Sequence, residues 1–158
     1  MTYTLSPWSL DDLFPSLDSP EMQAAFEELE AQVLEFEALR PSLAPDIPIQ
    51  AFQDAIRKLE TIQKLSMRLG SYPQLAFAAN TQDQAVVTFM GTVEDRLAAV
   101  SNRTLFFTLW WKQLEQAAAD RLLAAAGDVR YWLEAQRMFR PHTLTEPEEK
   151  IINIKNTT

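Results

Sequence analysis

Apolar residues recur every three or four positions along most of the chain, which is the spacing that places them on one face of an α-helix. The first series predicts a helix from Pro20 to Arg40, with Ser19 as its N-cap and Pro41 at its end. Its apolar positions are Met22, Phe26, Leu29, Val33 and Phe36. Alternating steps of four and three residues are typical of the seam between packed helices.

A second series predicts a helix from about Pro48 to Leu69, with Gly70 as its C-terminal cap. Its apolar positions are Phe52, Ile56, Leu59, Ile62, Leu65 and Leu69. A short helical piece from Pro73 to Ala79 should follow, because Asn80 and Thr81 suit a stop and a new N-cap.

The third series begins after Thr81, and Gln84 three residues later is the partner expected in a capping box. It continues to Val100, after which Ser101-Asn102 predicts a break or a kink. Residues 104–126 form a further predicted helix that is apolar on more than one side. A helix of this kind is usually central to its bundle.

Two shorter helices complete the pattern. Gly127-Asp128 should separate the central helix from a helix at Tyr131–Met138. The last helix should begin after Thr145, because Pro147 suits the first turn. The Glu148-Glu149 pair would then place negative charge at the positive end of the helix dipole.

These elements predict an all-α protein, an antiparallel helical bundle with long helical hairpins. The chain has only three glycines, which argues against a turn-rich β protein and against a Gly-rich phosphate loop. Its 158 residues suffice for one domain with a sizeable core, so we expect a single helical domain over residues 1–158.

Composition narrows the possible partners and compartments. Hydrophobic residues make up 47% of the chain and charged residues 23%, which is ordinary for a folded domain. The net charge of -8 disfavours binding to nucleic acid or to an acidic membrane surface. The chain has no cysteine, no recognisable signal peptide and no apolar run near the roughly 20 residues that span a bilayer. We therefore expect a cytoplasmic protein.

The residues offer little candidate chemistry. His142 and Glu146 have a spacing that could give two metal ligands on a helix, but the prolines around them indicate a connector, where a loop or hydrogen-bonding role is expected. The pairs Asp11-Asp12, Glu27-Glu28 and Glu148-Glu149 are adjacent in sequence and so would point apart on a helix. We expect no catalytic, cofactor-binding or metal-ligating residue in this chain.

The aromatic run Phe106-Phe107-x-x-Trp110-Trp111 has two interpretations. The simpler is core packing, because aromatic side chains dominate core burial. The other is that some of these residues form a surface that docks on another part of a larger protein. Different residues of the run could satisfy both interpretations.

Three stretches resemble the N-terminal region of oligoendopeptidase F-type zinc metallopeptidases, which are thimet oligopeptidase-like. The longest is Tyr131 to Lys155, which reads YWLEAQRMFRPHTLTEPEEKIINIK. It is similar to a Tyr-x-Leu-Glu helix that leads into Arg-x-x-Arg-Pro-His-x-Leu-x-Glu-x-Glu-Glu-Lys. The others are Trp8 to Phe14 (WSLDDLF), which resembles the family's opening, and Asn102 to Trp111 (NRTLFFTLWW), which resembles its middle.

The resemblance implies that this chain is the front of a larger enzyme. Such peptidases hold zinc on a His-Glu-x-x-His helix, whereas this chain has the single histidine His142, so no catalytic residue can be carried over. The resemblance implies a helical lobe that forms one wall of a channel for short peptides. The expected partners are the missing catalytic domain and, for the parent enzyme, zinc and oligopeptide substrates.

A second hypothesis is a self-sufficient helical interaction module, because seams with four-three spacing also suit association with a partner helix. Ile151, Ile152 and Ile154 favour the fragment, since they look like the start of an unfinished core contact. They would also make the chain prone to weak self-association.

Overall fold

The structure is a computed structural model, and it describes residues 9–155. Trp8, the first residue of the opening motif, lies outside the described residues. Helices, including short 3-10 turns, take up 78% of these residues, and no strand occurs between residues 9 and 155. The elements in chain order are α1 (Pro20–Glu37), η1 (Arg40–Ser42), α2 (Ile49–Ala79), α3 (Gln84–Gln113), α4 (Gln116–Leu123), η2 (Gly127–Val129), α5 (Arg130–Met138), η3 (Arg140–His142) and α6 (Glu146–Lys155). The predicted all-α class is confirmed.

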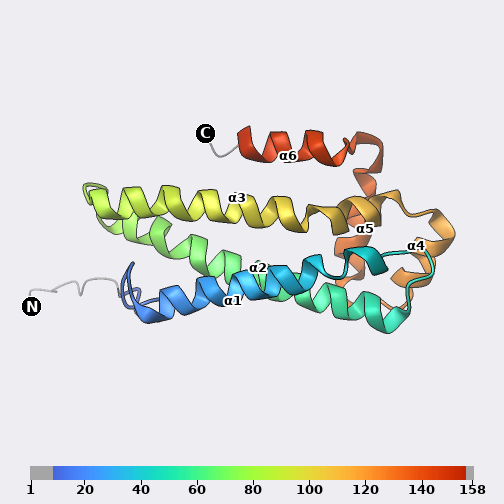
Figure 1. Ribbon diagram of the computed structural model, residues 1–158, viewed down its shortest axis with the longest axis horizontal. Coiled ribbons are helices and arrows are strands. Elements are labelled where there is room, and N and C mark those ends of the chain that lie inside the picture. The colour runs from blue at the N-terminus through green and yellow to red at the C-terminus, as the bar shows by residue number, and fades with distance from the viewer. Residues whose placement is uncertain (1–8, 156–158) are drawn as a thin grey trace, which may run out of the picture.

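Three long antiparallel helices form the body of the molecule (Figure 1). Helix α2 packs against both α1 and α3, and α1 also contacts α3. Helices α4 and α5 lie together at the end where α2 begins, and α6 runs back along the outer side of α3 (Figure 1). This arrangement is an antiparallel bundle with long hairpins, as the periodicity predicts. No helix between residues 9 and 155 combines the length and the apolarity needed to cross a bilayer.

Helix α1 follows the prediction closely. The Ser19 hydroxyl accepts a hydrogen bond from the Met22 N–H at 3.2 Å, and Pro20 occupies the first helical position. Four of the five predicted seam residues are buried and the fifth, Phe26, is half-buried. The seams of α2 and α3 are likewise buried or half-buried along their length. Local periodicity therefore identifies the core faces of all three long helices.

Helix α2 does not end at Gly70, so the prediction of a C-terminal cap there is wrong. The helix continues without a break through Gly70 and Pro73 to Ala79, which merges it with the short piece predicted separately. A Cβ atom on Gly70 would lie 3.0 Å from the Leu97 side chain, so the glycine serves the close approach of α3. Tyr72 and Pro73 are both buried, and this packing outweighs the hydrogen bond that proline removes from the helix.

Helix α3 differs from the prediction at both ends and in the middle. Its N-cap is Asp83 and not Thr81, and the Asp83 carboxylate accepts hydrogen bonds from the Ala85 and Val86 N–H groups at 2.9 and 3.3 Å. The predicted break at Ser101-Asn102 is absent, because the helix runs unbroken to Gln113. The predicted helix over residues 104–126 is instead divided at Leu114, where the backbone is extended. Leu114 is buried, and this turn folds α4 back onto the core.

The end of α3 is fastened to α5 by two side chains. The Trp111 indole N–H donates to the Leu133 carbonyl at 2.9 Å, and both residues are fully buried. The Arg137 guanidinium donates to the Trp111 carbonyl at 2.8 Å and to the Leu114 carbonyl at 2.9 Å. These carbonyls lie at the end of α3, where the helix itself supplies no donors. We call this set of contacts the α3–α5 junction.

Replacing Arg137 by methionine should lower the free energy of unfolding by about 2 kcal/mol, because two partly buried carbonyls lose their donors. Urea denaturation followed by circular dichroism measures this loss. Arg130→Met is the matched control, since Arg130 pairs only with Glu134 on the exposed surface of α5 and should cost less than about 0.5 kcal/mol. Equal losses in the two variants would show that the α3–α5 junction contributes no more than a surface ion pair.

Candidate functional site

Most of the exposed large apolar side chains among residues 9–155 fall between the start of α5 and the end of α6. This placement follows from how the α3–α5 junction holds α5, because Leu133 and Arg137 face the core and turn the other side of the helix outward. Tyr131 is 80% exposed and Met138 is 78% exposed. We define the α5–α6 surface by its exposed large apolar residues, which are Tyr131, Trp132, Met138, Phe139, Leu144, Ile151, Ile152 and Ile154. Most of the large hydrophobic residues that are exposed among residues 9–155 belong to it.

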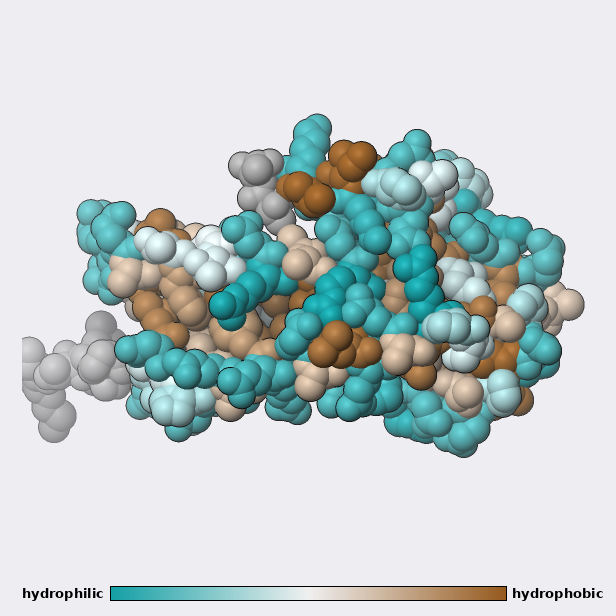
Figure 2. All heavy atoms as spheres, viewed as in Figure 1, coloured by the Kyte–Doolittle hydropathy of each residue, from teal (hydrophilic) through white to brown (hydrophobic). Residues whose placement is uncertain are grey.

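Helix α6 contributes the isoleucines of this surface. No residue of α6 is buried, and Ile151 is 65% exposed. Figure 2 shows hydrophobic side chains on the side of α6 that faces away from α3. Exposed apolar side chains that gather on a protein surface often mark a binding site. The α5–α6 surface is therefore the candidate binding surface.

The aromatic run in α3 belongs to the core and not to this surface. Phe106, Phe107 and Trp111 are buried and Trp110 is half-buried, which confirms the simpler interpretation. Phe36 of α1 lies 5.2 Å from Phe106 and 5.7 Å from Phe107, measured between ring centroids. The exposed large aromatic side chains among residues 9–155 lie on α5 and after it.

A groove of about 670 Å³ runs between α2 and α3 and reaches α5. Helix α3 directs Arg103 towards α1, whereas Leu105 and Thr108 line the groove. Trp132 of α5 and Asn153 of α6 also line it, so the groove adjoins the α5–α6 surface. Its size falls within the range of about 300–1,000 Å³ that is usual for binding sites.

His142 and Glu146 do not form a metal site. His142 is exposed in η3 and Glu146 begins α6, which confirms that they lie at a connector. The Glu146 carboxylate accepts hydrogen bonds from Arg40 and forms an ion pair with Lys150, so its oxygens already face two cations. No group of three or more potential ligands gathers anywhere in residues 9–155.

The adjacent acid pairs have structural or surface positions. Asp11, Asp12, Glu27 and Glu28 are all exposed. The Glu148-Glu149 pair instead holds the start of α6. Glu148 accepts hydrogen bonds from the Thr145 N–H at 2.9 Å and from the Thr145 hydroxyl at 2.6 Å, and these bonds lower the pKa of Glu148. Glu149 accepts from the Leu144 N–H at 3.1 Å, so the predicted start of α6 is confirmed.

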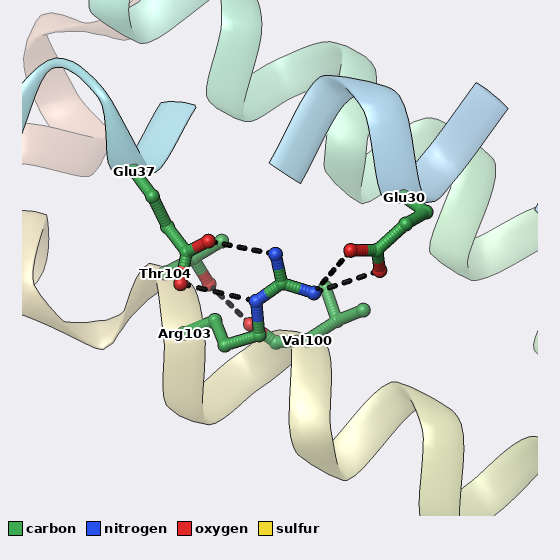
Figure 3. Close-up of polar contacts among 5 residues, drawn as sticks. All are labelled: Glu30, Glu37, Val100, Arg103 and Thr104. Atoms are coloured by element: carbon green, nitrogen blue, oxygen red, sulfur yellow. Dashed lines mark hydrogen bonds and ion pairs between the residues drawn. The ribbon is translucent and has the colours of Figure 1, made fainter. Parts of the chain in front are cut away.

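A charged clamp joins α3 to α1 (Figure 3). The Arg103 guanidinium donates to Glu37 through Nε at 3.0 Å and through Nη2 at 2.7 Å, and its Nη1 lies 2.8 and 2.7 Å from the two oxygens of Glu30. The hydrogen bonds from Arg103 hold the pKa of Glu37 below its usual value, and the two carboxylates raise the pKa of Arg103. The clamp positions α1, and its paired charges suit a structural role.

Comparison of the chain with protein-family models, with curated proteins and with solved structures finds no match.

The clamp should make the stability of the bundle sensitive to acid. The pKa of Glu37 is lowered in the folded state, so its contribution is present at neutral pH and is lost as the pH falls through that lowered value. Glu37→Gln should therefore lose less stability than the parent protein between neutral pH and about pH 3.5, measured by urea denaturation. Glu28→Gln, at an exposed position on the same helix, is the control. A control with the same reduced acid sensitivity would contradict this assignment.

The α5–α6 surface should support weak self-association. The double variant Tyr131→Ser/Ile151→Ser removes two exposed apolar residues and should weaken association in sedimentation equilibrium by several-fold. Leu34→Ser is the control, because Leu34 is 56% exposed but lies on α1. If Leu34→Ser has the larger effect, the molecules associate through α1 instead.

Proposed function

We propose that this chain is the N-terminal helical lobe of a zinc metalloendopeptidase that hydrolyses oligopeptides. In this proposal the α5–α6 surface packs against the zinc-binding part of the enzyme, and the lobe helps to shape the substrate channel. The single histidine of the chain cannot supply a His-Glu-x-x-His motif, so in this proposal the lobe contributes shape and contact surface.

One observation carries the proposal. The stretch from Tyr131 to Lys155 bears the longest resemblance to oligoendopeptidase F-type enzymes, and it also contains the α5–α6 surface. Packing within this lobe explains why Leu133 is apolar and why Arg137 can donate hydrogen bonds to α3. It does not explain why the exposed residues Tyr131 and Met138 are apolar. A contact with the rest of an enzyme supplies the missing reason, because a larger core would bury these side chains.

The compartment we propose is the cytoplasm. The chain contains no cysteine, which fits a reducing environment, and enzymes of the family resembled here act on short peptides.

A helical interaction module is the second candidate, and the groove between α2 and α3 favours it. The groove lies between two antiparallel helices, where a further helix packs in a larger bundle. In that case the groove, and not the α5–α6 surface, would carry the main contact.

Peptide hydrolysis distinguishes the two functions. The chain alone should not cleave fluorogenic oligopeptides, because it cannot contain His-Glu-x-x-His with one histidine. A longer product of the same gene that carries this motif should cleave them, and a chelator should abolish the cleavage. Chelator-sensitive cleavage by the chain alone would refute the proposal, and a longer product without the motif or the activity would favour the interaction module.

The contact itself is tested by calorimetric titration of the chain with the separately produced zinc-binding part. The double variant Tyr131→Ser/Met138→Ser should weaken binding by about tenfold or more, since exposed aromatic anchors dominate such interfaces. Met67→Ser is the control, because Met67 is exposed at the groove on α2. A larger loss in the control would place the contact in the groove.

A further inference from the structure

We propose that α6 is a detachable strap, joined to the bundle by one polar contact to Arg40 of η1 and one to Asn102 of α3, and able to leave the bundle. This inference goes beyond the proposed function, since it concerns a motion within the chain itself.

The first observation is the lack of buried apolar residues in α6. Each of the other α-helices buries at least one apolar side chain, and α1 alone buries five hydrophobic residues, whereas α6 buries none. Burial of apolar surface is the main term that holds helices together in water. Helix α6 therefore lacks the interaction that fixes α1, α2 and α3 to one another.

The second observation is a pair of polar contacts that join α6 to the bundle. At its start, Glu146 accepts hydrogen bonds from Arg40 at 3.2 and 2.6 Å, with a geometry in which both carboxylate oxygens are used. Two turns later, the Asn153 side-chain amide donates to the Asn102 carbonyl oxygen at 2.9 Å. These contacts lie about 10 Å apart along α6. We call them the start latch and the end latch.

The third observation is the space beneath the start latch. A hollow of about 260 Å³ lies there, and its lining includes Arg40, Glu146, Leu109 and Trp110. The Trp110 indole N–H is buried and has no hydrogen-bond partner among the described residues. Glu146 of the first turn therefore borders a hollow beside α3.

The start latch is ionic and lies at the surface. The Arg40 side chain is 55% exposed and the Glu146 side chain is 24% exposed. Exposed ion pairs are weak and are screened by salt. The start latch should thus open with rising ionic strength, while the apolar seams of the long helices are unaffected. When α6 leaves, it uncovers the side of α3 near Leu109 and Trp110 and redirects the isoleucines of the α5–α6 surface.

Hydrogen–deuterium exchange of the whole chain tests the strap. The variants Arg40→Gln and Asn102→Ala each remove one latch from outside α6, so the sequence of α6 is unchanged. Each should speed exchange of the α6 amides by roughly 3- to 10-fold and leave α2 unchanged, because a ten-residue helix that has left the bundle is only marginally stable and its amide hydrogen bonds open. Arg57→Gln is the control, because Arg57 pairs only with Asp54 on α2. Exchange of α6 that is unaltered in the Arg40→Gln/Asn102→Ala double variant would overturn the proposal.

A distance measurement separates detachment of α6 from unfolding of the whole bundle. The chain has no cysteine, so Leu34→Cys/Ile151→Cys gives two exposed sites for spin labels, one on α1 and one on α6. Pulsed electron paramagnetic resonance should show a docked distance and a second, longer one that grows with salt and in Arg40→Gln. A single distance under all conditions would overturn the strap, and so would a longer distance that appears only with loss of most of the helical circular dichroism, since the whole bundle would then be unfolding.

Discussion

The α3–α5 junction determines which side of α5 faces outward. The end of α3 presents carbonyl groups that the helix cannot satisfy, and Arg137 reaches back from α5 to bind two of them. The Trp111 indole N–H fixes the same helix through the Leu133 carbonyl. Because Leu133 and Arg137 must face α3, Tyr131 and Met138 must face outward. The candidate binding surface is thus a consequence of the hydrogen bonds that α5 donates to the carbonyl groups at the end of α3.

The molecule is held together in two different ways. Helices α1, α2 and α3 share a continuous apolar core, to which the Arg103 clamp adds a charged contact between α1 and α3. Helix α6, by contrast, buries no residue, and the start latch and the end latch join it to the bundle. Core packing resists small displacements because interiors are close-packed, whereas exposed polar contacts can be exchanged for water. The same chain therefore combines a close-packed bundle of α1, α2 and α3 with an attachment of α6 that salt should weaken.

The sequence predicts what is local and misses what depends on distant contacts. The seam of α1 and the Ser19 cap are read correctly, because a period of 3.6 and a capping hydroxyl act within a few residues. Gly70 is misread, because its role is set by Leu97 on another helix. The outward face of α5 cannot be predicted either, since it is decided by hydrogen bonds between Arg137 and the end of α3. Of the residues on the α5–α6 surface, only the isoleucines of α6 are predicted from the sequence to make an apolar contact, because they form an apolar run close after a helix start.

Charge constrains which partner the α5–α6 surface can hold firmly. Each copy of the chain carries a net charge of -8, so two copies in contact repel one another through most of their surface. Salt screens this repulsion over about 8 Å at physiological ionic strength, which allows weak contact but opposes a tight one. A partner that is less acidic is not repelled in this way and can bury the same apolar side chains. The apolar surface and the acidic remainder together favour a different polypeptide over a second copy, and they do so without reference to any family resemblance.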